Sequence, residues 1–317
     1  MIRRILLATP LALGLVACSG SEGDDHDHMH HEMEAFALSF GAMAGGNAVD
    51  CTSEITGMGP GGATTVGISD IRFYVSGVRL LDADGAELEM TLDTNDFLYT
   101  SDAGSVALID LTGNTAGTCT GAALAGAEGT ARTNDRITGM VHGDIAAVEL
   151  DIGLPQAIMK DVIATNSAED APSPLGELYW SWASGYRHLV FNFTVETGTT
   201  AGEGYVHVGS RDCGGDGARA LTDRDSCGFV NNPHISLSSF DAANDKIMID
   251  VGELLGGVDF ITAVRDPNPP HEVIGMGPGV ACHSSPMQDD CMSIFTNLGL
   301  DMSTGDSTGT NAVFSAR

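Results

Sequence analysis

Apolar and polar residues alternate along much of the chain, most clearly between positions 178 and 213. This alternation predicts a half-buried strand. Its two faces would be Leu189, Phe191, Phe193 and Val195 on one side and His188, Asn192 and Thr194 on the other. The Gly-rich run 198–204 predicts a loop or turn, and a second short strand, Tyr205 to Val208, would carry His207 opposite Val206 and Val208. Because both tryptophans and Cys213 flank this ribbon, we interpret it as a rigid platform for a metal or another ligand.

Similar patterns predict further strands along the chain. They begin at Phe36, Leu38 and Phe40 and recur at 68–81 (a strand pair or one long strand), 87–92 after an Asp84-Gly85 turn, 106–111, 135–154, 233–237 and 246–255. Helices are expected at 155–164 and 291–300. Residues 264–290 contain five prolines, and we expect them to form an irregular segment. The pattern predicts an all-β protein, an antiparallel β-sandwich with long disulfide-bonded loops and a few short helices.

The first residues carry an export signal. Arg3 and Arg4 precede an apolar run that is too short to span a bilayer, and this run ends in Leu15-Val16-Ala17-Cys18. The tetrapeptide resembles a bacterial lipobox, which implies cleavage before Cys18 and its lipidation; a plain secretory signal is the alternative. Ser19, directly after the lipidated cysteine, favours sorting of the lipoprotein to the outer membrane, where it would face the periplasm or the cell surface. We therefore expect a signal peptide at 1–17, a disordered tether at 18–35 and the β domain at 36–317.

The charge is strongly negative. The formal net charge is −29, and loss of residues 1–17 makes it −31, with only Lys160 and Lys246 left as lysines. Nucleic acid is an unsuitable partner, because phosphate binding needs clustered cations.

Six cysteines remain besides Cys18, an even number that predicts disulfides in an exported chain. The spacing favours local pairs, Cys213 with Cys227 and Cys282 with Cys291. This leaves Cys51 with Cys119, which is one of several connectivities that six cysteines allow. A thiolate metal site is the alternative, although the chain has no C-x-x-C pair.

The tether is rich in residues that bind soft metals. It holds His26, His28, Met29, His30 and His31 among acidic residues. Imidazole and thioether groups can bind copper or zinc, and the alternative is a spacer whose histidines are incidental.

Several ordered motifs resemble one family, the MbnP-like copper-binding proteins with the four-Cys motif of the metallo-mystery pair. They are Ser69-Asp70-Ile71-Arg72-Phe73-Tyr74-Val75, Val106-Ala107-Leu108-Ile109-Asp110, Gly153-Leu154-Pro155, Trp180-x-Trp182-x-x-Gly185-Tyr186, His207-x-Gly209-Ser210-x-x-Cys213, Asn232-Pro233, and Cys282-x-Ser284 followed by Cys291-x-x-Ile294-Phe295. The resemblance covers residues 36 to 300. Many relatives have Asn-His shortly after the Gly-hydrophobic-Pro turn, where this chain has Ile158-Met159-Lys160, so one potential ligand is either missing or replaced by Met159.

The resemblance implies copper as the cofactor and a dihaem, MauG-like (MbnH-like) peroxidase as the partner. This peroxidase would oxidise a tryptophan to kynurenine, and here only Trp180 or Trp182 could be its substrate. Both tryptophans can equally be core aromatics.

The candidate copper ligands in the folded body are histidines and one methionine. His207 and His234 come first, followed by His188, His142 and Met140, with His271 and His283 as weaker candidates. Two other functions remain open. One is a structural or adhesion β-sandwich without a built metal site, and the other is a metal-dependent hydrolase, for which no acid–base motif is legible. We expect a binding protein rather than an enzyme.

Overall fold

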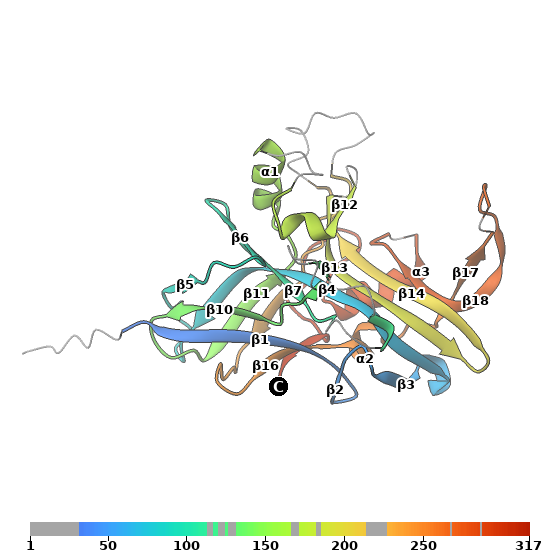
Figure 1. Cartoon of the computed structure of the whole chain (residues 1–317), viewed down its shortest axis with the longest axis horizontal. Coiled ribbons are helices and arrows are strands. Elements are labelled where there is room, and N and C mark those ends of the chain that lie inside the picture. Colours follow the sequence, from blue (N-terminus) through green and yellow to red (C-terminus); the bar gives the residue numbers. More distant parts are fainter. Residues whose placement is uncertain are drawn as a thin grey trace, which may run out of the picture. The chain divides into compact units, whose positions relative to one another are not determined.

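The long strand β4 (Thr64–Leu81) organises the fold, because four other strands pair with it: β3 (Glu54–Met58), β7 (Gly104–Asp110), β11 (Ala147–Ile152) and β13 (Gly185–Thr197). The computed structural model describes residues 32–112, 117–119, 124–125, 131–165, 171–181, 185–213, 227–266, 268–285 and 287–317. The stretch 68–81 is therefore part of one continuous strand, visible as the long cyan ribbon in Figure 1.

Two large sheets contain most of the strands. The first has the order β19 (Phe314–Ala316), β16 (Lys246–Asp250), β1 (Glu34–Ala44), β10 (Arg136–Val141), β5 (Met90–Leu92), with β2 (Asn47–Val49) beside β1. The second has the order β15 (His234–Leu237), β11, β4, β13, β14 (Thr200–Gly209), β18 (Val273–Cys282), β17 (Ile261–Arg265), with β3, β6 (Leu98–Ser101), β7 and β12 (Tyr179–Ser181) beside it. A small pair, β8 (Leu124–Ala125) and β9 (Ala131–Arg132), lies apart from both.

The main core lies between the two sheets. Phe40 of β1 contacts Phe73 of β4 edge to face, with ring centroids 5.8 Å apart. The predicted apolar face of β13, from Leu189 to Val195, is buried in this core. The predicted β-sandwich is thus confirmed. Its sheets are mixed, because β1 with β16 and β14 with β18 pair in parallel.

A second apolar cluster covers part of the outer face of the second sheet. Helix α1 (Gln156–Thr165), as predicted at 155–164, contributes Ile158 and Val162 to this cluster, and Figure 1 shows the helix above the sheet. Tyr74 of β4 is buried there and donates its hydroxyl proton to the Leu175 carbonyl at 2.7 Å. No helix in the described ranges is both long and apolar enough to cross a membrane.

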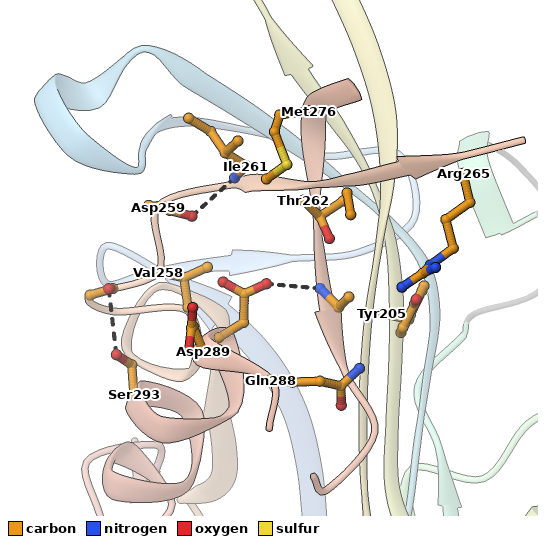
Figure 2. Close-up of a pocket in the computed structure, with 14 residues that line it drawn as sticks. Tyr205, Val258, Asp259, Ile261, Thr262, Arg265, Met276, Gln288, Asp289 and Ser293 are labelled. Carbon is orange, nitrogen blue, oxygen red and sulfur yellow. Dashed lines mark hydrogen bonds between the residues drawn. The ribbon is translucent and has the colours of Figure 1, made fainter. Parts of the chain in front are cut away.

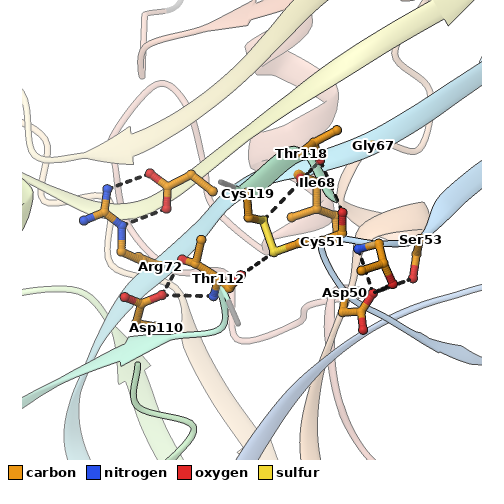
Figure 3. Close-up of a disulfide and its surroundings, with 12 residues drawn as sticks. Asp50, Cys51, Ser53, Gly67, Ile68, Arg72, Asp110, Thr112, Thr118 and Cys119 are labelled. Atoms are coloured by element: carbon orange, nitrogen blue, oxygen red, sulfur yellow. Dashed lines mark hydrogen bonds and ion pairs between the residues drawn. A yellow bond between two sulfur atoms is a disulfide. The ribbon is translucent and has the colours of Figure 1, made fainter. Parts of the chain in front are cut away.

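Three disulfides join the cysteines in the predicted pairs, which are Cys51–Cys119, Cys213–Cys227 and Cys282–Cys291. Figure 3 shows the first of them beside β4, where the Thr118 N–H donates to the Cys51 carbonyl at 3.1 Å. The disulfides fix loops that the sheets alone would not hold.

Three predicted segments differ in the structure. The stretch 246–255 is strand only to Asp250, whose carboxylate accepts hydrogen bonds from two backbone N–H groups and caps helix α2 (Val251–Leu254). Strand β14 starts at Thr200 rather than Tyr205, after a tight turn in which Gly198 has a φ of 62°. Residues 264–290 are not irregular, because β17 and β18 form a ribbon and helix α3 (Asp289–Asn297) begins within the stretch.

Candidate metal centre

Two neighbouring strands bring two histidines together on the outer face of the second sheet. Strand β14 pairs with β18 in parallel, with Val206 opposite Cys282. His207, the next residue of β14, therefore lies beside His283, which directly follows the end of β18. The Nδ1 atoms of the two rings are 3.0 Å apart, and the ring centroids are 4.8 Å apart.

Two aromatic side chains enclose this histidine pair. The Tyr205 ring, two residues before His207 on the same strand face, stacks on His283 with centroids 4.3 Å apart. Trp180 of β12 lies 5.5 Å from the His283 ring and 6.2 Å from the His207 ring, centroid to centroid. The ring nitrogens thus face each other inside an aromatic enclosure.

Hydrogen bonds fix which nitrogen of His207 carries the proton. Asp70 forms a two-pronged ion pair with Arg72, at 2.6 and 2.7 Å, so its carboxylate can only accept. The amide NH₂ of Asn192 therefore faces Asp70, at 3.4 Å, and the amide oxygen faces His207 Nε2, at 2.8 Å. It follows that Nε2 of a neutral His207 donates this bond, and that Nδ1 presents a lone pair toward His283.

The environment keeps both rings neutral. Burial lowers the pKa of His207 to about 3, and His283, Arg187 and Arg72 contribute to this lowering. Burial also lowers the pKa of His283, with a further contribution from Arg187. Two neutral imidazoles are the form in which histidine binds metals.

The backbone around His283 is held from both sides. Cys282 is tied to Cys291, and the His283 N–H donates to the Gln288 side-chain oxygen at 2.7 Å. The Ser284 hydroxyl donates to the His207 carbonyl and accepts from the Gly209 N–H, at 2.9 and 2.8 Å. The spacing between the two histidines is therefore set by strand pairing, a disulfide and side-chain bonds together.

Of the leading candidate ligands, only His207 lies in the pair. His234 starts β15, at the far end of the same sheet beyond β11, β4 and β13, and its Nδ1 lies 2.8 Å from the Asp151 carboxylate. His188 is fully buried, and burial lowers its pKa to about 4. Its Nδ1 accepts from the Leu154 N–H at 3.1 Å and its Nε2 faces the Val230 carbonyl at 2.9 Å. Both nitrogens of His188 are therefore engaged in structural bonds.

The other candidates lie elsewhere. Met140 is in β10 of the first sheet and His142 follows that strand. Met159 is buried in the α1 cluster. Outside the described residues lie Trp182, Cys18 and the tether residues His26, His28, Met29, His30 and His31.

Sequence reasoning gave His283 little weight and did not include Asn192 or Tyr205 among the candidates. The alternating pattern already places Asn192 on the polar face of its strand and Tyr205 on the same face as His207. The proximity of His283 to His207 depends on the parallel register of β14 and β18. That register could not be predicted, because residues 264–290 were expected to be irregular.

Across the described residues, no three His, Cys, Asp or Glu side chains come together in a way that could hold a metal ion. A donor set of two neutral imidazoles with aromatic neighbours does not suit calcium or magnesium, which take oxygen ligands. Imidazole ligands suit copper, zinc, iron and nickel.

Fold and site together define a class of protein: a disulfide-bonded β-sandwich with a histidine pair in an aromatic enclosure on one sheet. The chain belongs to the MbnP family, whose model matches residues 33–273. The solved structure of MbnP from Methylosinus trichosporium is similar to this chain, with a TM-score of 0.65 and 22% identity over 90% of this chain and 98% of that one. This likeness shows a shared fold. No curated protein matches the chain.

Proposed function

We propose that the chain is an exported copper-binding protein that holds Cu(I) between His207 and His283. The observation that carries the proposal is the pair of facing Nδ1 atoms, 3.0 Å apart, in a half-buried and neutral site. Bound copper would be available for transfer, so the role is acquisition or handling of copper rather than catalysis.

The charges around the pair support the monovalent ion. Arg187 and Arg72 disfavour positive charge on the imidazoles, and the same field opposes a divalent cation more strongly than a monovalent one. Asp70 offsets Arg72 and orients Asn192, and through Asn192 it orients His207. Such outer-shell partners tune the affinity of histidine ligands for metals.

Trp180 is the tryptophan that we propose as the substrate of a dihaem, MauG-like peroxidase. Its ring centroid lies 5.5 Å from that of His283 and 6.2 Å from that of His207, so conversion to kynurenine would place a carbonyl and an aniline group beside the pair. Those groups would supply further polar donors to the copper site.

We further propose that the protein is anchored in the cell envelope through a lipidated Cys18. The three disulfides support an oxidising compartment. The tether histidines would form a second, weaker copper site that acts separately from the pair.

Metal analysis of the full chain, purified from its native host with His26, His28, His30 and His31 changed to Ser, tests the proposal. We expect close to one copper per chain, and little in His207→Ala or His283→Ala. His234→Ala, which removes a histidine of the same sheet that lies outside the pair, is the matched control and should keep its copper. Equal copper in all four proteins, or no copper in any, would refute the proposed site.

A further inference from the structure

The exposed large apolar side chains of the described residues are concentrated in one stretch of the chain, between positions 261 and 292. These are Ile261, Val264, Val273, Ile274, Met276, Met287 and Met292, with exposed fractions from 42% to 87%. Five of them belong to the β17–β18 ribbon, Met292 lies in α3, and Met287 lies just before that helix. We call this set the ribbon patch. Exposed apolar side chains are ordinary when scattered, but a gathering of this kind marks an interaction surface.

The ribbon has apolar side chains on both faces. Met276 pairs with Ala263, and Val264 pairs with Gly275, so neighbouring apolar groups point to opposite sides. Figure 1 shows the ribbon at the edge of the fold. A surface ribbon covered only by water would be expected to have at least one polar face.

A cleft of about 680 Å³ lies between this ribbon and α3 (Figure 2). Ile261 and Met276 line it from the ribbon, and Asp289 lines it from the helix. The cleft adjoins the histidine pair. Tyr205 lines the cleft and stacks on His283, and Gln288 lines the cleft and accepts the His283 N–H. A molecule seated on the ribbon patch would therefore contact one wall of the histidine pair.

The charge around the cleft distinguishes the molecules that could cover the ribbon patch, which are a second copy of the chain, a lipid surface and another protein. The cleft is lined by three carboxylates, Asp259, Asp289 and Asp290, and by one cation, Arg265, so negative charge is in excess there, on a chain of formal charge −29. A second copy would bring like charges together, and an anionic lipid surface would be repelled in the same way. The turn between the two strands, positions 266–272, is polar, unlike a segment that inserts into a bilayer.

We propose that the ribbon patch is the docking surface for a protein partner whose contact face has an apolar centre surrounded by Lys and Arg. Its apolar centre covers Ile274 and Met276, and its cations meet the cleft carboxylates. Docking itself does not require copper in the pair. We further infer that the docked partner exchanges copper or electrons with the histidine pair past Tyr205, and this part of the inference rests on the proposed function.

The test uses the full chain in its native host, with a photo-cross-linking amino acid at Ile274. Thr91, exposed on β5 of the other sheet, receives the same probe as the matched control. We expect one protein to be cross-linked from position 274 and not from position 91. That protein, once identified and purified, should bind the wild-type chain with an affinity that falls as salt rises. Ile274→Asp and Met276→Asp should each weaken binding by about tenfold or more, and Thr91→Asp should not.

Other outcomes would overturn the proposal. They are a cross-link between two copies of the chain, association with vesicles of phosphatidylethanolamine and phosphatidylglycerol that Ile274→Asp abolishes, no adduct from position 274, or a captured protein that binds the patch variants as well as the wild type. The patch variants should keep their copper, whereas His207→Ala should lose it. Failure of docking is thereby distinguished from failure of the proposed copper site.

Discussion

Replacing Asn192 by Leu tests how the fold prepares His207 for a metal. The amide oxygen of Asn192 accepts from His207 Nε2 at 2.8 Å, and this bond leaves Nδ1 unprotonated. In Asn192→Leu the proton can move to Nδ1, where the facing nitrogen of His283 accepts it. Metal binding would then have to return the proton to Nε2, at a half-buried position without an acceptor.

The expected loss of Cu(I) affinity follows from the cost of returning the proton to Nε2. A buried donor left without a partner costs about 1–3 kcal/mol, which corresponds to a loss of affinity of roughly 5- to 150-fold. Removing the outer-shell partner of a metal-binding histidine typically costs about 10- to 100-fold. The two estimates overlap, so we expect Asn192→Leu to weaken Cu(I) binding about 10- to 100-fold.

Anaerobic competition against a coloured Cu(I) chelator measures this affinity in the chain without tether histidines. Thr194→Val is the matched control, because Thr194 lies on the same face of β13 and bonds to the Gly67 carbonyl instead of to the pair. A change below about threefold in Asn192→Leu, or an equal loss in both variants, would refute the argument that Asn192 selects the tautomer.

Three further predictions follow from the same site and its surroundings. Burial lowers the pKa of His207 to about 3 and also lowers that of His283, so the loss of Cu(I) affinity on acidification should begin below the pH at which exposed histidines take up a proton. Chelator competition at a series of pH values would contradict this if the affinity already fell steeply from about pH 6.5. The buried His188 has a pKa of about 4 in the folded protein against 6.5 in the unfolded chain, so its contribution to stability is full above about pH 6.5 and falls by up to roughly 3 kcal/mol as the pH drops to about 4. Urea unfolding at several pH values should show a shallower pH dependence for His188→Gln than for the wild type, and equal slopes would contradict this. Kynurenine should be found by mass spectrometry in the tryptic peptide that spans residues 161–187 and should be absent in Trp180→Phe; kynurenine that persists in this variant would move the modification to Trp182.

The alternating pattern was enough to predict the sandwich and its main core. Leu189, Phe191 and Phe193 lie on one face of β13 because the two-residue period fixes the facing of every side chain. The cysteine spacing likewise favoured the pairs that the structure contains, since Cys213 and Cys227 close a short loop.

The site could be predicted only in part, because it depends on contacts between distant strands. The same pattern that placed His207 on the outer face of its strand also placed His188 on the polar side. A register shift between Arg187 and Leu189 instead turns His188 into a buried position where it bonds to the backbone. His283 became a neighbour of His207 through parallel pairing 76 residues away along the chain. Neither event leaves a local signal in the sequence.

The segment 264–290 shows why composition alone misleads. Pro269 and Pro270 lie in the turn between β17 and β18, where no ladder hydrogen bond is needed from them. Pro278 lies inside β18 itself, opposite Ile261, so the proline content of the segment does not exclude a strand.

Anomalous diffraction at the copper edge from crystals of the copper-loaded full chain tests the central claim most directly. We expect one strong peak about 2 Å from Nδ1 of His207 and from Nδ1 of His283, beside the line that joins these atoms, with the Trp180 side chain next to it. A peak at His234 or at the tether histidines, with none at the pair, would contradict the account.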